Sequence, residues 1–419
     1  MSNWPVIKLG KIATGFLSGG TPPTKRPEYW QGETPWITSK WLGKHLELKD
    51  GEKFVSEEAL KKTSTRIVPK DNIIFATRVG VGKIGINRVD LAINQDLAGI
   101  LIDKDKFDIR FIAYQLGIDP IQQYVAMNKR GATIKGITRE CLKDIRLNLP
   151  PLPEQKKIAH ILSTVQRAIE EQERIIQTTT ELKKALMQKL FTEGLRNEPK
   201  KQTEIGSVPE SWEVVPLGSI AKVGNGSTPK RANESYWKCG TIPWLNSTKI
   251  HDRFIVEADQ FVTPQAVKEC HLPRVAPNSL LIAITGQGKT LGNSALTRIE
   301  TCINQHLAYA QFHNENVVPD FVLWFMQKCY DFLRSIGQAG GSTKGALTCG
   351  YLKTHLIPIP DIDEQIEIVK VFSQLDNKEK VTRQKKVTLQ DLFCTLLHEL
   401  MTAKIRIHHL ELPDSPHTS

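Results

Sequence analysis

Residues 151–195 read PLPEQKKIAHILSTVQRAIEEQERIIQTTTELKKALMQKLFTEGL. After the prolines, apolar side chains recur at every third or fourth position from about Gln155 to Glu193, which predicts one long helix with an apolar stripe. The spacing persists over several heptads, which is typical of a helix that pairs with another helix. Gly194 is placed to end the helix as a C′ glycine. The residues expected to pack are Ile158, Leu162, Val165, Ile169, Ile176, Leu186 and Leu190.

A second stretch near the C-terminus has the same design. It follows PDIDEQ (residues 360–365) and predicts a helix from about Gln365 to Lys404. An apolar stripe of this length would be insoluble alone, so we expect the two helices to pack on each other. If the two copies are related by a pseudo-twofold axis, the helices run antiparallel. The packing residues expected here are Ile368, Phe372, Leu375, Leu389, Leu392, Leu396 and Leu400.

The two helices belong to an internal repeat that covers most of the chain. Leu9–Ala13 (LGKIA) returns as Leu217–Ala221 (LGSIA), an offset of 208 (217 − 9). The offset drifts by only a few residues over the unit, so we interpret it as a tandem duplication. Further matched pairs are Thr21-Pro22 with Thr228-Pro229, Tyr29-Trp30 with Tyr236-Trp237, Pro35-Trp36 with Pro243-Trp244, Asn94-Gln95 with Asn304-Gln305, and Glu154-Gln155 with Glu364-Gln365.

The part of each repeat before its helix is rich in Gly, Pro, Thr and Asn and contains short β-prone runs, such as Asn72–Thr77 and Leu280–Thr285. These features predict a mixed α/β domain with many strands and loops. The expected fold class is α+β: two such domains alternating with two long helices packed as an antiparallel coiled coil. The expected bounds are 1–152, helix 153–196, 197–362 with a linker at 197–206, helix 363–406, and a disordered tail at 407–419.

The composition is that of a soluble protein, with 40% hydrophobic and 24% charged residues. The net charge of +11 favours partners that carry phosphate. The seven cysteines are scattered singly, as expected for reduced thiols. No signal peptide and no apolar run of roughly 18 residues is present, and we expect a cytoplasmic protein.

Two glycine-rich segments match the sequence patterns of nucleotide-binding motifs. Gly80, Gly82 and Gly85 match G-x-G-x-x-G, but a strand-like segment follows them, so a hairpin is the better interpretation. Ala283–Thr290 (AITGQGKT) satisfies a relaxed P-loop pattern, but Gly292 and the residue after it interrupt the helix that a P-loop needs. Metal-ligand spacings such as H-E-x-x-H are absent as well. We therefore predict no catalytic residue, no cofactor-binding residue and no metal ligand in this chain.

The junction after the first helix carries a family resemblance. Lys189–Leu195 (KLFTEGL) is followed by Thr203–Trp212 (TEIGSVPESW) and Glu213–Ala221 (EVVPLGSIA). Together with the twin Pro/Glu-Gln helix entries, this junction resembles the specificity subunits of type I restriction–modification systems, and the resemblance covers nearly the whole chain. One departure is that Trp4 begins the first repeat without the Gly-x-x-Pro lead-in that precedes Trp212.

The resemblance implies a non-catalytic DNA-binding subunit. Each domain would be a target recognition domain that reads one half of a bipartite, asymmetric site in double-stranded DNA. The helices would be spacers that fix the distance between the halves and dock two methyltransferase subunits. S-adenosylmethionine, Mg and ATP would belong to the methyltransferase and restriction subunits. Two alternatives stay open: an ATP-hydrolysing enzyme acting through residues 283–290, and a coiled-coil assembly protein.

Reading DNA needs polar side chains on loops for the bases and cations for the phosphates. Shared residues such as Trp36, Trp244, Asn94 and Asn304 are better explained as framework, because domains that read different sequences should differ where they touch bases. Shared lysines can hold phosphates without specifying sequence. The candidate DNA contacts are Ser39, Lys40, Arg78, Lys83, Gln95, Arg130 and Lys135 in the first repeat, and Ser247, Lys249, Gln287, Lys289, Gln305 and Lys344 in the second.

Overall fold

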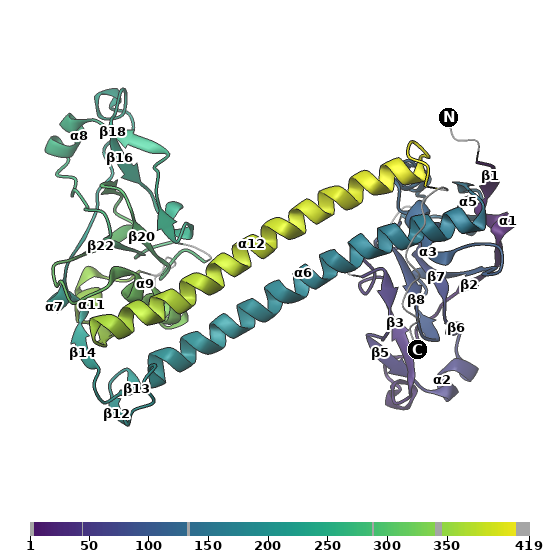
Figure 1. Ribbon diagram of the computed structural model, residues 1–419, viewed down its shortest axis with the longest axis horizontal. Helices are drawn as coiled ribbons and strands as arrows, with labels where there is room; N and C mark the ends of the chain where they lie inside the picture. Colours follow the sequence, from purple (N-terminus) through teal and green to yellow (C-terminus); the bar gives the residue numbers. More distant parts are fainter. Residues whose placement is uncertain (1–3, 44, 132–134, 287–288, 340–345, 408–419) are drawn as a thin grey trace. The chain divides into compact units, whose positions relative to one another are not determined.

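The computed structural model describes residues 4–43, 45–131, 135–286, 289–339 and 346–407. The chain forms two compact units (Figure 1). Unit 1 combines Met1–Ile175 with Thr382–Ser419, and unit 2 is Ile176–Val381. Each unit therefore contains one α/β domain and one half of each long helix. Two predictions, the disordered tail beyond residue 407 and the contacts of Gln287 and Lys344, concern residues outside the described part of the chain.

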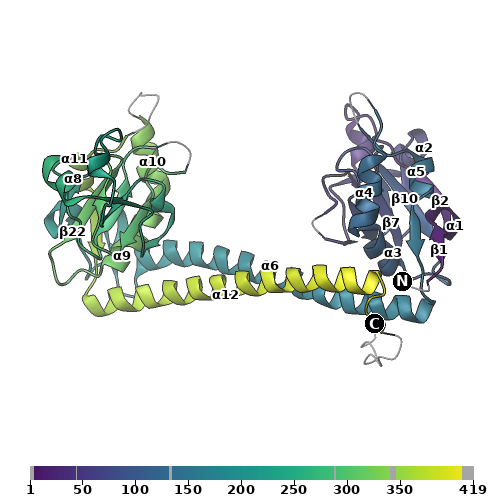
Figure 2. The ribbon, with the colours of Figure 1, turned by 90° about the horizontal axis from the view of Figure 1, so that it is seen from above.

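The domain of unit 1 is built on a five-stranded sheet of order β2-β10-β7-β8-β4 and a four-stranded sheet of order β5-β3-β9-β6. Helix α3 packs on β7 and β8 (Figure 2). Its strands are β1 (Val6–Lys8), β2 (Ala13–Ser18), β3 (Thr34–Ile37), β4 (Glu47–Leu48), β5 (Lys53–Val55), β6 (Arg66–Val68), β7 (Asn72–Ala76), β8 (Ile84–Asn87), β9 (Leu91–Ile93), β10 (Leu97–Ile102) and β11 (Arg146–Asn148). Its helices are α1 (Leu9–Ile12), η1 (Pro27–Trp30), α2 (Glu57–Lys62), α3 (Ile109–Leu116), α4 (Asp119–Met127) and α5 (Arg139–Lys143).

The domain of unit 2 repeats this topology with the order β15-β22-β19-β20-β17, and its second sheet is β18-β16-β21. Where unit 1 has β6, unit 2 has a single bridge between Val275 and Thr301. The strands are β12 (Lys200–Thr203), β13 (Gly206–Pro209), β14 (Glu213–Pro216), β15 (Ala221–Asn225), β16 (Ile242–Leu245), β17 (Phe254–Ile255), β18 (Gln260–Val262), β19 (Leu280–Ala283), β20 (Ser294–Thr297), β21 (Cys302–Ile303), β22 (Leu307–Phe312) and β23 (Leu356–Ile359). The helices are α7 (Leu217–Ile220), η2 (Glu234–Tyr236), η3 (Lys249–His251), α8 (Pro264–Glu269), α9 (Pro319–Lys328), α10 (Tyr330–Ala339) and α11 (Cys349–Thr354).

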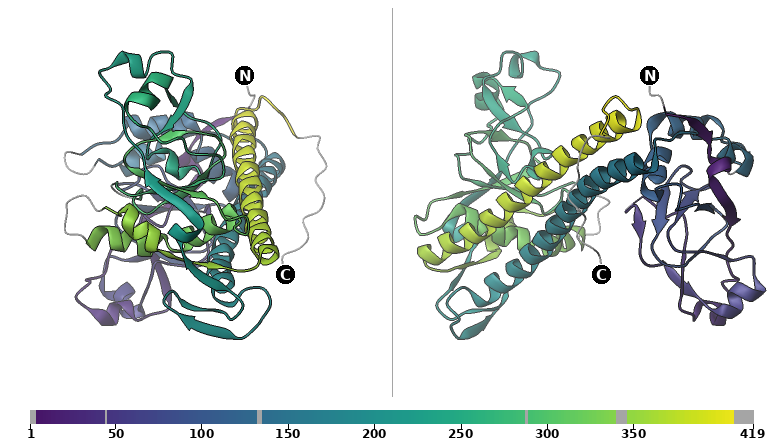
Figure 3. Two further views of the ribbon diagram at one scale, coloured as in Figure 1. Left: turned by 90° about the vertical axis from the view of Figure 1, so that its left-hand side faces the viewer. Right: turned by 45° about the vertical axis from the view of Figure 1, so that its right-hand side comes forward.

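Two long helices, α6 (Leu152–Glu193) and α12 (Ile362–Met401), each begin in one unit and end in the other (Figures 1 and 3). Gly194, which follows α6, has φ +63°, as the C′ prediction requires. A Cβ at this position would also lie 2.7 Å from Glu364 Oε1. After α12, Ala403 adopts φ +54°. Among the described helices, none is long and apolar enough to cross a membrane.

The Glu-Gln pair at each helix entry ties the long helix to the domain before it. Gln155 is buried; its Nε2 donates to Pro150 O (2.8 Å) and its Oε1 accepts from the Asp108 amide (3.0 Å). In unit 2, Gln365 Nε2 donates to Pro360 O and its Oε1 accepts from the Val318 amide, both at 2.8 Å. Because Asp108 and Val318 are the N-caps of α3 and α9, the motif fixes where these helices start against the long ones.

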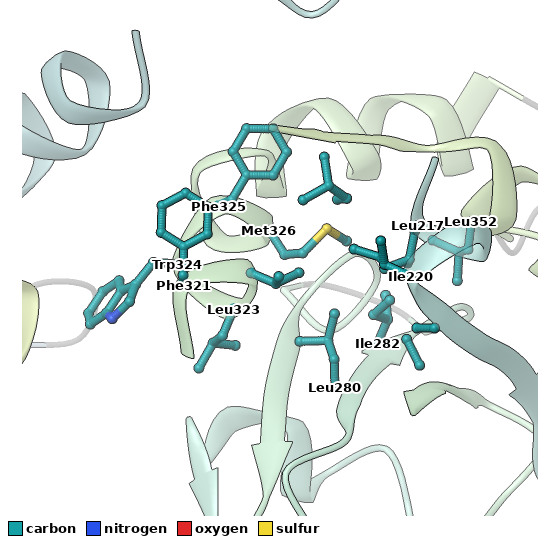
Figure 4. Packing of buried hydrophobic residues seen from close by; sticks show 14 of the residues in the cluster. Leu217, Ile220, Leu280, Ile282, Phe321, Leu323, Trp324, Phe325, Met326 and Leu352 are labelled. Carbon is teal, nitrogen blue, oxygen red and sulfur yellow. The ribbon is translucent and has the colours of Figure 1, made fainter. Parts of the chain in front are cut away.

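The far end of each long helix completes a hydrophobic core. Leu190 and Phe191 of α6 lie in the core of unit 2, where the Phe191 ring stacks on Phe372 at 6.0 Å. Residues of α9, including Phe321 and Phe325, form the same cluster (Figure 4). Likewise, Leu400 and Met401 at the end of α12, and Ile407 beyond it, lie in the core of unit 1 together with Trp4.

Most residues of the expected helix stripe are buried or half-buried, but Leu392 is 45% exposed and the prediction for it was wrong. Phe393 takes the inward position instead, with its ring 5.8 Å from Tyr114. The sequence could not decide between them, because Leu389–Leu392–Leu396 and Leu389–Phe393–Leu396 both have helical spacing of three and four.

The Phe191 contacts predict a large loss of stability on truncation. Phe191→Ala should lower the free energy of unfolding by about 3–5 kcal/mol, because the ring is fully buried among other aromatic rings. Denaturant unfolding of the full chain measures the loss. Leu182→Ala, on the same helix but 48% exposed, is the matched control and should change stability by less than about 0.5 kcal/mol. Equal losses in both variants would contradict this account of the core.

Candidate nucleic-acid interface

A pair of tryptophans forms the same scaffold in both domains. Trp36 is buried and its Nε1 donates to Gly20 O at 3.1 Å, with the Trp30 ring meeting it edge-on at 5.0 Å. In unit 2, Trp244 Nε1 donates to Ser227 O at 3.2 Å, and Trp237 meets it at 5.1 Å. These contacts are internal to each domain, which agrees with the interpretation of the shared tryptophans as framework.

The shared Asn-Gln pair builds a turn that presents an exposed glutamine. Asn94 and Asn304 are buried, and their Oδ1 atoms accept the amides of Asp96 (3.2 Å) and His306 (3.0 Å). The Thr21 hydroxyl donates to Gln95 Oε1 at 2.5 Å, and the corresponding threonine of unit 2 holds its glutamine in the same way. With Oε1 occupied, Gln95 Nε2 is the group left to donate to a ligand, whereas Gln305 Nε2 also lies 3.2 Å from His306 Nε2.

The glycine-rich segments lie at the turns beside these glutamines. Strands β7 and β8 are antiparallel neighbours, and Gly80 (φ +65°) and Gly82 (φ +96°) form the turn between them, as the hairpin interpretation predicted. In unit 2, strand β20 follows Thr290 and pairs with β19. A P-loop would have a helix there to bind phosphate with its N-terminus.

An open pocket of about 560 Å³ lies beside the β7–β8 turn of unit 1 and is lined by Gln95 and three arginines, Arg78, Arg130 and Arg139. Arg139 donates to Ser18 Oγ at 2.6 Å. Arg78 and Arg130 are exposed, and neither side chain forms a hydrogen bond or ion pair with a described residue. Guanidinium groups placed in this way suit phosphate oxygens or the acceptor edge of guanine.

Some predicted contacts are poorly placed to touch a ligand. Ser39 is 4% exposed. Lys249 is ion-paired with Asp259 (3.0 Å) and Asp252 (3.5 Å), and the hydrogen bond to Asp259 raises its pKa. Ser247 is half-buried. The predicted basic residues that are exposed are Lys40, Arg78, Lys83, Arg130, Lys135 and Lys289.

Arg139 lines the pocket but is not among the contacts predicted from the sequence. It begins α5 immediately after the capping Thr138, and the corresponding residue after Thr348 is Cys349. Aligning the two capping threonines reveals this charge difference in the sequence.

The described residues contain no cluster of three or more His, Cys, Asp or Glu side chains able to hold a metal ion. All seven cysteines are free. Burial raises the pKa of Cys302 and of Cys329 to about 11, which keeps both thiols protonated at neutral pH.

Two copies of one α/β domain, with a shared scaffold and different polar side chains at the same exposed turn, define a tandem recognition protein. The comparison with known families agrees. The chain belongs to the family of the type I restriction modification DNA specificity domain, whose profile matches residues 1–179 and 209–391.

Relatives along the whole chain support this assignment. The type I restriction enzyme MjaIX specificity subunit of Methanocaldococcus jannaschii is 27% identical over 433 aligned positions, covering 97% of this chain and 95% of the relative. The putative MjaX specificity subunit of the same organism is 30% identical over 68% of this chain and 65% of its own length. In fold, the chain is similar to the S subunit of a type I system from M. genitalium, with a TM-score of 0.59, 17% identity, and coverage of 95% and 96% of the two chains.

Proposed function

We propose that this chain is the sequence-reading subunit of a type I restriction–modification complex, in which unit 1 and unit 2 each read one half of a bipartite, asymmetric DNA site. The observation that carries the proposal is that corresponding threonines hold the Oε1 atoms of Gln95 and Gln305 in the same way, while the side chains beside the two glutamines differ. A shared scaffold with different neighbours suits two readers of different sequences. A cytoplasmic setting fits access to the DNA.

We further propose that α6 and α12 pair as an antiparallel coiled coil that sets the spacing between the half-sites. In unit 2, Lys183 of α6 pairs with Asp376 (2.8 Å) and Glu379 (3.3 Å) of α12. In unit 1, Lys386 of α12 pairs with Glu173 of α6. From Glu173 to Lys183 the residue numbers rise along α6, while those of their partners on α12 fall from Lys386 to Asp376. This opposite order is what an antiparallel pair requires. Buried Thr179 and Thr382 lie between these two sets of ion pairs in the sequence of each helix.

The partners in this proposal are double-stranded DNA, two methyltransferase subunits docked through the helices, and restriction subunits. S-adenosylmethionine, Mg and ATP would act in those subunits and not in this chain. Within the chain, exposed lysines such as Lys40, Lys83, Lys135 and Lys289 are proposed to bind phosphates. Arg78 and Arg130 are proposed to face the bases, and the shared Gln95 and Gln305 to contact the DNA beside them.

A labelling experiment tests the proposal. The chain alone should transfer no methyl group from tritiated S-adenosylmethionine to DNA, whereas the chain with its methyltransferase subunit should label adenines in one bipartite motif. Methylome sequencing of the same DNA identifies the motif. The methyltransferase without this chain is the control and should give no motif-specific label. Label transfer by the chain alone, or labelling without a defined motif in the complex, would refute the proposal.

A further inference from the structure

Strand register identifies which residues of the two domains occupy equivalent places. Ala76 pairs with Leu97 in unit 1, and Ala283 pairs with Leu307 in unit 2. Asp96 and His306 are the residues just before Leu97 and Leu307, so they correspond. Arg78 and Thr285 each lie two residues beyond the paired alanine, so they correspond as well.

In both domains the backbone holds the two positions together. The Thr77 amide donates to Asp96 O at 2.8 Å and the Arg78 amide at 3.3 Å. In unit 2, the Ile284 amide donates to His306 O at 3.0 Å. The Thr285 hydroxyl and His306 Nδ1 are 2.5 Å apart. The pair therefore sits at one defined place, next to the glutamine that both domains present in the same way.

The chemistry at this shared place differs between the domains. Unit 1 has a cation and a carboxylate, and Arg78 also lines the arginine pocket. Unit 2 has a hydroxyl and an imidazole that contact each other, and Gln305 Nε2 lies 3.2 Å from His306 Nε2. A phosphate contact carries no sequence information and can be the same in both halves, whereas a base contact must change with the base.

We propose that Arg78 and Asp96 read a guanine–cytosine pair in the half-site of unit 1, and that Thr285 and His306 read the equivalent position of the other half-site. The inference rests on the proposed function. The Arg78 guanidinium matches guanine O6 and N7, and a carboxylate accepts from cytosine N4. Asp96 Oδ2 already accepts from Asn94 Nδ2 at 3.0 Å, which orients the carboxylate and leaves its other oxygen for the base.

Exchanging the two positions tests the inference in the complex with the methyltransferase subunit. Arg78→Thr with Asp96→His should lower the preference for the guanine–cytosine pair at one position of one half-site by roughly ten- to a hundredfold. The second half-site and the spacer should stay unchanged. Thr285→Arg with His306→Asp should alter only the other half-site. Methylome sequencing gives the base preference at each position. Lys40→Ala, at an exposed lysine, is the phosphate-type control and should weaken methylation without changing the motif.

The outcomes separate this inference from the proposed function. A wild-type complex without a bipartite motif refutes the proposed function itself. A normal wild-type motif that the double variants leave unchanged, with methylation only uniformly weaker, overturns the inference and shows phosphate contacts instead. If Arg78→Thr with Asp96→His abolishes all methylation, the base preference of the single variant Arg78→Lys tests the inference instead. This variant keeps the charge but loses the planar fork, so it should retain DNA affinity and lose base preference. Full base preference in Arg78→Lys overturns the inference.

Discussion

Inserting four residues into α6 after Ile175 and four into α12 after Val381 should lengthen the gap between the half-sites by one to two base pairs and leave both half-site sequences unchanged. Four residues add about 6 Å to a helix, and a base pair occupies about 3.4 Å. Both insertions lie where the chain passes between the two compact units. At 42 residues, α6 is about 63 Å long, against about 34 Å for one turn of B-DNA.

Both helices must be lengthened together, because an insertion in one alone cannot keep Lys183 in register with Asp376 and also Glu173 in register with Lys386. The insertion in α6 alone is therefore the matched control and should reduce methylation. The sequence suggests the end of the stripe after Leu190 as an insertion point, but Leu190 and Phe191 lie in the core of unit 2. Methylome sequencing reads the spacer and both half-sites together. An unchanged spacer in an active double-insertion variant would show that the helices do not set the distance.

The fragment of residues 1–197 should form a homodimer at tens of micromolar, because the ends of the two helices are interchangeable. Leu190 and Phe191 near the end of α6 and Arg196 just beyond it have the same spacing as Leu400 and Met401 at the end of α12 and Arg406 beyond it. Arg406 binds Glu154 at 2.9 Å, and Arg196 lies 3.9 Å from Glu364, the residue equivalent to Glu154. In the fragment, residues 190–196 of a second copy can therefore fill the place that residues 400–406 leave in the core of unit 1.

Sedimentation equilibrium measures the dimer, and with methyltransferase subunits it should direct methylation to a symmetric site of two identical halves. Arg196→Ala in the fragment should weaken dimerisation, because a buried Glu154 would lose its partner. Arg174→Ala, in an exposed pair with Glu171 on α6, serves as the control and should leave the dimer intact. A strictly monomeric fragment would argue against the equivalence of the helix ends.

The features predicted from the sequence are those that occur in both repeats. Matched motifs revealed two copies of one domain, and apolar spacing located both long helices. The structure adds contacts that spacing does not encode: Gln155 and Gln365 fix α3 and α9, and Phe393 takes the inward position expected for Leu392. The contacts of the two glutamines and the inward position of Phe393 both depend on residues far away in the sequence, such as Asp108, Val318 and Tyr114.

The candidate site was less predictable because sequence comparison of the halves highlights what they share. The residues that it highlighted include Ser39, which is buried, and Lys249, which is ion-paired with two aspartates. Asp96 and His306 directly follow the shared Asn-Gln pair, so the sequence already aligns them. Their neighbours Arg78 and Thr285 are shown to correspond only by the strand register.

The division of the chain into units has a consequence for its synthesis on the ribosome. Unit 2 is one continuous segment, Ile176–Val381, so all residues of its core emerge before the chain is finished. Unit 1 begins earlier but closes later, since Leu400, Met401 and Ile407 belong to its core. The core of unit 1 is therefore complete only after the end of α12 has been synthesised, although most of unit 1 is translated first. The nascent chain completes the core of unit 2 before that of unit 1.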